Sequence, residues 1–382
     1  MNSKFVLHHV GARNGSRGFP IVKKFEKDIV TIFYEACEDG NDQIISQAKR
    51  NGAGETLLIN ACIGSKSQIQ NFYINRDPFM SSVYPANQDY SDFYNDLKIY
   101  DNLMSQILEP VEVSKIQVSS LDEIILKREL PSCDFLSIDV QGGELDVLKG
   151  ANDSLINTSG VLLEVEFAEM YEGQPLFGEV DEFLKSNGFK FIRFLGFQEW
   201  APRTVSIEGR GRKLHVAADA LYLKDWSLVK KSNIDRLVFS ALSFGQTEFA
   251  LKVIQQQNYL NLEGSDTSWR EFVRSFIKLT TDLHNLPPTF SDVYSVDESF
   301  GRFNESYSAL AHENLVIEGI FNLWRLLPVA LRSKIKRSLG TARDTVAMFK
   351  RLMSRRSKLE RLFSDSGLKA IANELRKSRL RR

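Results

Sequence analysis

Cysteine and histidine are scarce in this sequence, and neither is spaced as metal ligands usually are. The three cysteines, Cys37, Cys62 and Cys133, form no C-x-x-C pair, which argues against a zinc site or a disulfide framework. We expect three reduced thiols, as in a protein of the reducing cytoplasm. His8 and His9 are adjacent on an expected strand, so their side chains point to opposite faces and cannot share a metal. The other histidines are isolated, and we expect structural or surface roles for them: His215, His284 and His312.

Long hydrophobic runs are also missing. No stretch of about 18 apolar residues occurs, so no transmembrane helix is expected. The first residues lack the basic start, apolar stretch and small-residue cleavage site of a signal peptide. These absences favour a cytoplasmic protein, either free or bound peripherally at the inner face of a membrane.

The charge is balanced over the whole chain but not along it. Residues 328–382 contain 17 Lys and Arg against 4 Asp and Glu, a net charge of +13, whereas the preceding residues carry 32 against 45, a net charge of −13. A split of this size indicates a basic tail with a partner of its own.

Apolar runs alternate with helix-like segments over the first 225 residues. Strand-like runs occupy residues 5–10, 29–34, 56–63, 69–74, 134–140, 160–167, 188–195 and 214–223. Helical spacing is found at residues 18–27, 42–50, 144–150 and 177–187. The alternation predicts an α/β fold with a doubly wound, mainly parallel sheet and helices on both faces. No long helix separates the last two strands, so we expect an antiparallel edge there.

The remaining third of the chain has a different pattern. Apolar residues recur at helical spacing in residues 235–256, 268–283 and 308–327, and residues 286–305 are rich in Pro, Ser and Asp. This favours a helical C-terminal region rather than a continuation of the sheet. We therefore expect an α/β domain at residues 1–225, a helical appendage at residues 226–327 and a basic amphipathic helical tail at residues 328–382.

A glycine turn and an acid together indicate a cofactor that contains adenosine. The turn V-G-A-R-N-G follows the first strand directly, and Glu35 closes the second strand 24 positions after Gly11. Glycine permits a tight turn and lets backbone N–H groups approach a ligand. An acid at the end of the second strand can accept hydrogen bonds from the hydroxyls of a ribose. These two features alone do not separate NAD from S-adenosylmethionine.

The most specific block is D-F-L-S-I-D-V-Q-G-G-E-L-D-V-L-K-G-A at residues 134–151. It resembles the FkbM-type methyltransferases, whose signature is an apolar strand, then D-V-E-G-A-E, then an L-x-V-L-K-G helix. The resemblance covers about residues 5–225 and implies a Rossmann-like class I methyltransferase fold with S-adenosylmethionine as cofactor. The sequence departs from the family at His9, where Asp is frequent, at Gln141, where Glu is frequent, and at Gly143, where Ala is usual.

The resemblance also implies roles for individual residues. The first turn would line the methionine part of the cofactor through Gly11, Ala12, Asn14 and Gly15. Glu35 would hold the ribose, and Asn60 and Ala61 would flank the adenine. Asp139 would lie where the cofactor meets the acceptor.

Three acids are candidates for catalysis: Asp139, Glu166 and Glu144. Asp139 is the first choice as the base that takes the acceptor's proton, and Glu166 is the second. Glu144 opens a helix, where an acid is favoured by the helix dipole alone. Glu164 and Glu166 are two apart on one strand and so share a face, which indicates that they border a cleft. The aromatic residues Phe72, Tyr73 and Tyr84 are further candidates for an acceptor pocket.

The family resemblance implies methyl transfer to a hydroxyl oxygen, on a sugar or a lipid-linked glycan. Two other functions remain open: a non-catalytic S-adenosylmethionine-binding assembly module, which His9 and Gln141 keep open, and an NAD-dependent oxidoreductase, which leaves the block at residues 134–151 unexplained.

The basic tail mixes apolar and basic positions at spacings of three and four residues, which predicts an amphipathic helix. Such a helix can lie at an anionic membrane surface. A solvated helix, or one packed on the acidic remainder of the chain, is the alternative. Nucleic acid is a weaker candidate as partner, because the tail has few aromatic residues and no known nucleic-acid-binding motif.

Overall fold

The computed structural model describes residues 4–13, 17–20, 25–37, 41–50, 52–95, 97–99, 102–202, 213–257 and 267–281. These stretches belong to one compact unit, residues 1–307. The expectations for Asn14, Gly15, His284 and His312, and for residues 286–382, lie outside the described residues. In the described ranges no helix is long and apolar enough to cross a membrane.

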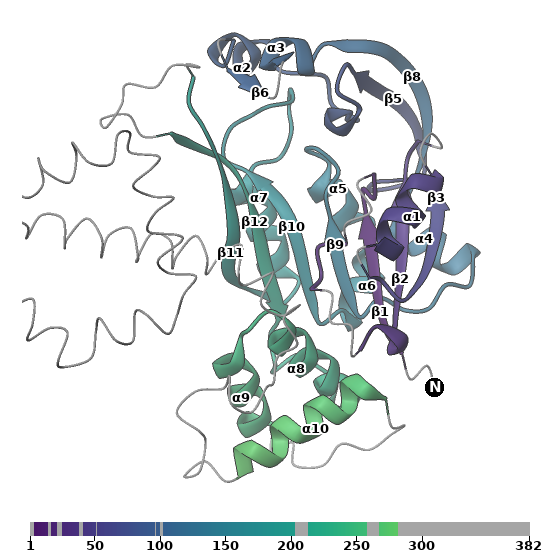
Figure 1. Cartoon of the computed structure of the whole chain (residues 1–382), viewed down its shortest axis with the longest axis vertical. Helices are drawn as coiled ribbons and strands as arrows, with labels where there is room; N and C mark the ends of the chain where they lie inside the picture. The colour runs from purple at the N-terminus through teal and green to yellow at the C-terminus, as the bar shows by residue number, and fades with distance from the viewer. Residues whose placement is uncertain are drawn as a thin grey trace, which may run out of the picture. The chain divides into compact units, whose positions relative to one another are not determined.

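A twisted sheet forms the centre of the molecule (Figure 1). Its seven strands, counted over the described residues, have the order β11-β12-β10-β9-β1-β2-β3. Their bounds are β1 Phe5–Val10, β2 Ile29–Glu35, β3 Glu55–Asn60, β9 Phe135–Ile138, β10 Gly160–Glu166, β11 Phe189–Trp200 and β12 Leu214–Lys224. Neighbouring strands from β3 to β10 are parallel, whereas β12 is antiparallel to both β10 and β11. The predicted doubly wound sheet with an antiparallel edge is confirmed.

One face of the sheet is covered by the helices that lead into β9, β10 and β11. Alternate strand residues such as Val6, Leu136 and Leu163 form a buried cluster with Leu148 and Leu184 of these helices. The helices are α4 Leu121–Lys127, α5 Glu144–Lys149, α6 Asn152–Asn157 and α7 Phe177–Ser186. Side chains on both faces of β1, β2 and β9 are buried, which explains why these strands read as continuous apolar runs.

The other face is covered by helices from two distant parts of the chain. Helix α1, Asn41–Arg50, packs its Ile44 and Ala48 on Phe33 of β2. The helix predicted at residues 18–27 is wrong in its described part, since residues 17–20 form a loop and Glu26–Asp28 a 3-10 turn. The area left uncovered by this connection is filled by helices α8 Ile234–Ser243, α9 Thr247–Gln256 and α10 Ser268–Thr281.

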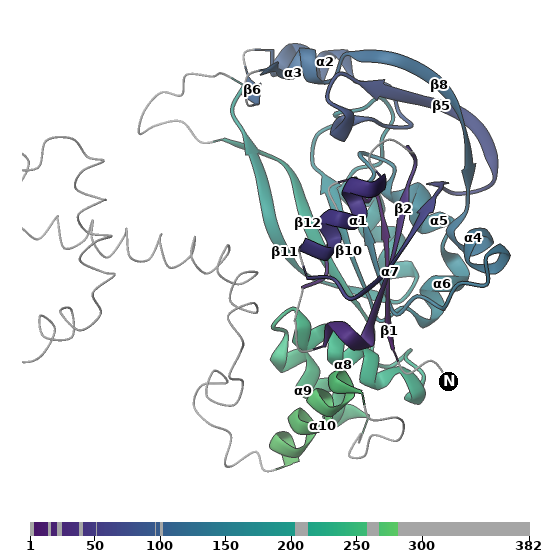
Figure 2. The same cartoon turned by 45° about the vertical axis from the view of Figure 1, so that its right-hand side comes forward.

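These three helices share one core with the sheet. Polar contacts join them to the amino-terminal ends of the strands: the Arg236 guanidinium donates to Asp134 at 2.6 Å, and the hydroxyls of Ser159 and Ser240 are 2.7 Å apart. Figure 2 shows them below the sheet, away from the carboxyl ends of its parallel strands. The pattern at residues 235–256 is interrupted at Gly245, whose φ of 69° ends α8. The sheet and helices α8 to α10 therefore lie in one compact unit, although the sequence places a boundary near residue 225.

A smaller sheet with the order β4-β8-β5 extends above the carboxyl ends of the central strands (Figure 1). Its strands are β4 Cys62–Ile63, β5 Gln68–Asn75 and β8 Pro110–Ser119. Beyond it lie α2 Gln88–Phe93, α3 Met104–Ile107 and the short strands β6 Lys98–Ile99 and β7 Asn102–Leu103. The single strand predicted at residues 56–63 divides at Ala61, so that β3 joins the central sheet and β4 joins the smaller one.

Candidate functional site

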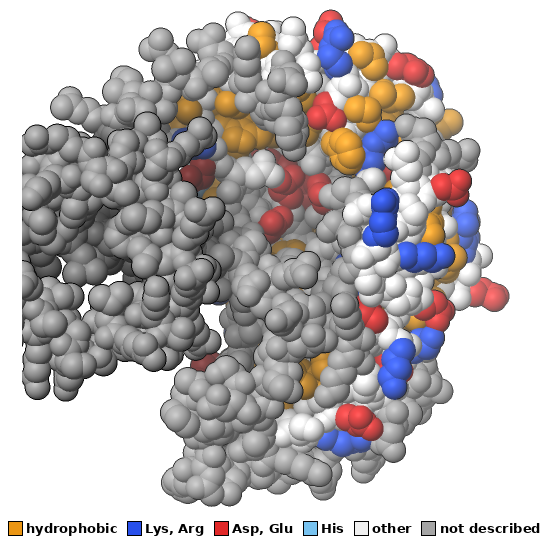
Figure 3. All heavy atoms as spheres, in the orientation of Figure 1, with side chains coloured by type: hydrophobic (Ala, Val, Ile, Leu, Met, Phe, Trp, Pro, Cys, Tyr) orange, Lys and Arg blue, Asp and Glu red, His pale blue; other side chains and the backbone are white. Residues whose placement is uncertain are grey.

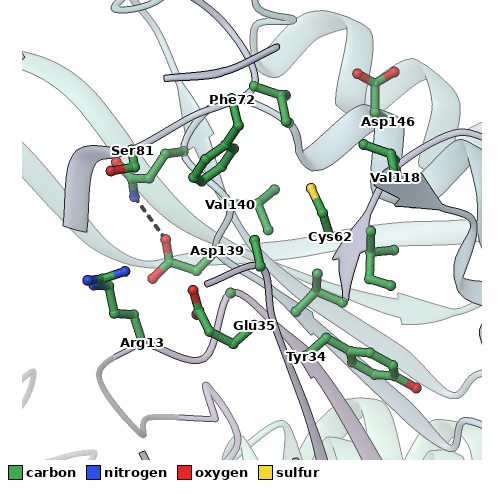
Figure 4. Close-up of a pocket in the computed structure, with 18 of the residues that line it drawn as sticks. Arg13, Tyr34, Glu35, Cys62, Phe72, Ser81, Val118, Asp139, Val140 and Asp146 are labelled. Atoms are coloured by element: carbon green, nitrogen blue, oxygen red, sulfur yellow. Dashed lines mark hydrogen bonds between the residues drawn. The ribbon is translucent and has the colours of Figure 1, made fainter. Parts of the chain in front are cut away.

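A cavity of about 480 Å³ opens at the carboxyl ends of β1, β2, β3 and β9. Ligands of open α/β sheets bind at this edge, beside the point where the strand order reverses. Here β1 is followed in the chain by β2 on one side and paired with β9 on the other. The smaller sheet closes the cavity from above with the side chains of Phe72 and Val118. Figure 4 shows Glu35, Asp139 and Val140 among the residues that line the cavity.

The turn after β1 is shaped by one glycine. Gly11 has φ 89°, and a Cβ at this position would lie 1.7 Å from the backbone oxygen of Asp139. The N–H groups of Gly11 and Ala12 both donate to the Tyr34 carbonyl oxygen, at 3.0 and 3.2 Å. The turn therefore lies against the ends of β2 and β9, and only glycine permits this approach. Gly11 lines the cavity, whereas Ala12 is fully buried beside Phe33.

Glu35 lines the cavity at the end of β2, as the sequence predicts for a ribose-binding acid. Its side chain accepts a hydrogen bond from the Cys37 N–H at 3.2 Å, which holds the carboxylate at the strand end. In Figure 4 the side chains of Glu35, Asp139 and Arg13 point toward one another. A carboxylate held at this place can accept hydrogen bonds from two neighbouring hydroxyls of a bound ligand.

The side of the cavity next to β3 is less polar. Ala61 and Cys62 line it together with Val118, which suits a flat aromatic base. Burial raises the pKa of the Cys62 thiol to about 12, so this cysteine stays protonated. Asn60 is exposed and does not line the cavity; its Oδ1 accepts a hydrogen bond from Asn41 at 2.9 Å.

Asp139 follows β9 and is held by the turn after it. The Gln141 amide donates to Asp139 Oδ1 at 3.0 Å and to Glu164 Oε2 at 3.4 Å. Gln141 and Gly142 both have left-handed backbones, with φ 56° and 94°, so the turn directs the Gln141 side chain back over the strand end. Gln141 thus bridges two carboxylates at the edge of the cavity.

Four carboxylates gather here on the ends of neighbouring strands, and we call them the acidic wall: Asp139, Glu164, Glu166 and Asp219. Glu164 is directly opposite Asp219 in the antiparallel pairing of β10 with β12, so the two side chains share a face. Burial raises the pKa of Asp139, and burial together with the neighbouring acids raises the pKa values of Glu164 and Glu166 well above their usual range. Asp219 is exposed, but partial desolvation by the surrounding protein and the charge of Asp139 raise its pKa above the usual range.

No Lys or Arg of the described stretches forms an ion pair with the acidic wall. Glu166 is the buried member of the wall, and a buried carboxylate without a cation is costly unless it is protonated or meets a ligand. The wall is therefore suited to accepting protons or to binding groups that donate hydrogen bonds. Of its members, Asp139 alone lines the cavity, while Gln141 and Gln198 lie between the cavity and Glu164.

Glu144 lies close to the acidic wall, and its charge helps to raise the pKa values of Glu164 and Glu166. It is 2% exposed, and its carboxylate accepts the Val140 N–H at 2.9 Å. Burial raises its pKa to about 7. Glu144 does not line the cavity. The structure therefore favours a structural role for it, fixing the turn at the start of α5, over a catalytic one.

The two adjacent histidines lie on opposite faces of β1 and support the fold. His8 lies within hydrogen-bonding distance of the Tyr34 hydroxyl and the Pro131 carbonyl, at 2.9 and 3.0 Å. His9 Nε2 lies 3.0 Å from the Gly11 carbonyl oxygen and so helps to hold the first turn. Burial lowers both pKa values to about 4, so both rings are neutral near pH 7. Among the described residues, no group of His, Cys, Asp or Glu could hold a metal ion.

Several cavity residues have no recognisable signal in the sequence. Arg13 lies inside the glycine turn but is not a conventional ligand position, and its guanidinium is 5.9 Å from the ring centre of Phe79. Gln198 comes from the antiparallel strand β11, far from the other motifs in sequence. Of the three candidate aromatic residues, Phe72 lines the cavity, whereas Tyr84 donates to Asp146 at 2.8 Å.

The raised pKa values predict how stability depends on pH. A carboxyl whose pKa is higher in the folded state binds more protons there, so stability falls as pH rises through the folded pKa. The lowered pKa values of His8 and His9 have the opposite effect: below about pH 6.5 they make the folded protein less stable as pH falls. Glu166→Gln removes one carboxyl of the wall, and we expect its melting temperature to exceed that of the wild type by roughly 2–4 °C near pH 8. The difference should shrink toward pH 5. Scanning calorimetry of both proteins measures it, and a constant difference across this range would contradict the pKa directions.

Comparison with known protein families also indicates a methyltransferase. The family model described as "Methyltransferase FkbM domain" matches residues 9–191. A search of curated proteins finds no match to the chain.

Among solved structures, the chain is similar to the precorrin-6y C5,15-methyltransferase of Geobacter metallireducens, with 12% identity, a TM-score of 0.30, and coverage of 59% of this chain and 82% of that one. It is also similar to the YcgJ protein of Bacillus subtilis, with 10% identity, a TM-score of 0.29, and coverage of 58% and 93%. These scores are low, so the fold assignment rests on the strand order and not on these alignments.

The family match spans both turns that build the cavity, from His9 before the glycine turn to Phe191 on β11, and it includes Asp139, Glu164 and Glu166 of the acidic wall. It confirms the methyltransferase fold and the S-adenosylmethionine cofactor that the sequence predicts. Residues 9–191 of this chain match the methyltransferase domain of the FkbM family.

Proposed function

We propose that this protein transfers the methyl group of S-adenosylmethionine to a hydroxyl oxygen of a sugar or glycan. The observation that carries the proposal is the position of Asp139, whose carboxylate lines the cofactor cavity and also belongs to the acidic wall beside it. A base at such a boundary can reach an acceptor that enters from the side of the wall.

The cavity suits the cofactor on three counts. Because Gly11 has no side chain, the first turn lies against the Asp139 backbone, and a ligand can bind beside it at the strand ends. Glu35 would accept hydrogen bonds from the ribose hydroxyls, and the apolar surface of Ala61 and Val118 would hold the adenine. When bound, S-adenosylmethionine supplies an electrophilic methyl group on a sulfonium.

The residues of the chain would do the remaining work by positioning and by proton transfer. As the acceptor oxygen forms its bond to the methyl carbon and the carbon–sulfur bond breaks, Asp139 would take the hydroxyl proton. Burial raises the pKa of Asp139, which brings it closer to the working pH of a general base. The hydrogen bond from Gln141 would keep the carboxylate directed toward the acceptor.

A methyl-labelled cofactor tests the proposal. The full-length protein is incubated with labelled S-adenosylmethionine and a panel of mono- and oligosaccharides, and the products are treated with mild base. We expect the label in a base-stable methyl ether. Label in a base-labile ester or on nitrogen would exclude a hydroxyl acceptor, and cofactor binding without any turnover would favour the non-catalytic assembly module.

We further propose that residues 328–382 bring the enzyme to an anionic membrane, where lipid-linked glycans are found. The support is the net charge of +13 and the amphipathic spacing of the segment. Each basic side chain near such a surface adds about 1 kcal/mol of attraction.

Vesicle co-sedimentation measures this interaction. The full-length chain should pellet with anionic vesicles, less so at high salt, and should stay in solution with neutral ones. A full-length variant with Arg332, Lys336, Arg343 and Lys350 changed to glutamine should pellet much less. Equal sedimentation of the two proteins would contradict the membrane role.

A further inference from the structure

The acidic wall extends beyond the cofactor cavity toward the small helices above it. Glu164, Glu166 and Asp219 do not line the cavity, yet they lie on the same sheet edge as Asp139. Figure 3 shows acidic side chains gathered in a hollow, with hydrophobic side chains along its upper rim. An acidic surface therefore adjoins the cavity.

Aromatic side chains from α2 and β11 lie beside this region. The ring of Tyr90 is 4.8 Å from that of Tyr94 and 6.3 Å from that of Trp200. These rings belong to a buried cluster with Val216, whose carbonyl oxygen accepts the N–H of Phe167, the residue after Glu166. The cluster thus brings Tyr90 to the end of β10.

The Tyr90 hydroxyl is a buried polar group that the fold leaves without a partner. Tyr90 is 7% exposed, and its oxygen has no hydrogen bond within the described part of the chain. Burial raises its pKa above the usual range, and Tyr94 and then the carboxylates of Glu166 and Glu164 raise it further. Buried hydroxyls are normally hydrogen-bonded, so one without a partner beside carboxylates indicates a missing ligand group.

The chemistry of these groups specifies the ligand. Glu166 is 3% exposed, and its carboxylate receives no hydrogen bond from a described side chain. Asp219 is exposed on the neighbouring strand β12, and no basic residue of the described ranges pairs with either carboxylate. A protonated primary amine offers three N–H donors and one positive charge. It would satisfy both the unused acceptors and the uncompensated charge, whereas a neutral hydroxyl would satisfy only the acceptors. Aromatic rings nearby also favour a cation.

We propose that Glu164, Glu166, Asp219 and the Tyr90 hydroxyl form a subsite for a protonated primary amine on the acceptor, next to the hydroxyl that Asp139 deprotonates. The inference rests on the proposed function and names its substrate class: an amino sugar or an amine-bearing glycan. The amine held in this subsite keeps its proton and has no free electron pair, so it anchors the acceptor and is not methylated. Gln141 and Gln198 lie between Glu164 and the cavity that would hold the positively charged cofactor.

Binding of two matched oligosaccharides tests the subsite without requiring methyl transfer. A glucosamine tetramer and an N-acetylglucosamine tetramer differ in their charged amines. Each is titrated calorimetrically near pH 7 into the full-length protein saturated with S-adenosylhomocysteine. We expect the glucosamine tetramer to bind at least about 10-fold more tightly. Equal binding of the two, or no binding of either, would overturn the subsite.

Variants separate the subsite from general electrostatics. Glu166→Gln and Asp219→Asn should each reduce the preference for the charged tetramer about fivefold or more while leaving affinity for S-adenosylhomocysteine unchanged. Glu172→Gln, which removes an exposed carboxyl in the following loop, should leave the preference intact. A preference that survives Glu166→Gln and Asp219→Asn in folded protein would contradict the proposal. If the wild-type protein does not bind S-adenosylhomocysteine at all, the proposed function itself is refuted.

Discussion

Replacing Asp139 with asparagine is expected to lower the turnover number about 100-fold or more, because the variant loses its positioned base. Asparagine preserves the shape of the side chain and can still contact Gln141. The dissociation constant for S-adenosylmethionine should therefore change little. Initial rates at saturating cofactor and acceptor measure the first quantity, and calorimetry measures the second.

The matched control is Asp153→Asn, which removes an exposed carboxyl on α6. It should retain wild-type turnover. If Asp139→Asn also retains wild-type turnover at saturating acceptor, the base lies elsewhere. Glu166 is then the next candidate, because it is the second choice from the sequence and lies on the neighbouring strand.

Replacing Glu35 with alanine is expected to weaken cofactor binding strongly. Each charge-assisted hydrogen bond from a ribose hydroxyl contributes roughly 1.5–3 kcal/mol, so the dissociation constant should rise at least about 10-fold. Calorimetric titration with S-adenosylhomocysteine measures this change, and circular dichroism checks that the variant is folded. Glu182→Ala, an exposed acid on α7, serves as the control and should bind like the wild type. Unchanged affinity in folded Glu35→Ala would remove this residue from the site.

The parts of the fold that could be predicted are those with short-range signals. The glycine turn at Gly11, the acid at Glu35 and the block around Asp139 each follow a buried apolar strand directly. Because parallel strands of one sheet end at the same edge, their order in the sequence is enough to bring them together. The structure places all three at one cavity.

The parts that could not be predicted depend on tertiary packing. Strand β8 has many exposed positions and therefore lacks the apolar run of a core strand. The segment at residues 18–27 has helical spacing, but its Phe19 and Phe25 enter the core that α8 to α10 complete. Sequence periodicity shows that a side chain is buried without showing which distant helix covers it.

For the same reason, the sequence predicts only part of the acidic wall. The two-residue spacing of Glu164 and Glu166 predicts a shared face, and the pairing of β10 with β12 agrees with it. Asp219 joins them from an antiparallel strand, a pairing that no local pattern encodes. Gln141 reads in the sequence as a missing acid, whereas in the structure its amide bridges Asp139 and Glu164.

A crystal structure of the full-length protein with S-adenosylhomocysteine tests the central claim most directly. The account predicts density for the ligand in the cavity at the carboxyl ends of β1, β2 and β9, with both ribose hydroxyls at hydrogen-bonding distance from the Glu35 carboxylate. It also predicts that the ligand sulfur lies on the side of the cavity nearest Asp139. Ligand bound away from this cavity, or a ribose that makes no contact with Glu35, would contradict it.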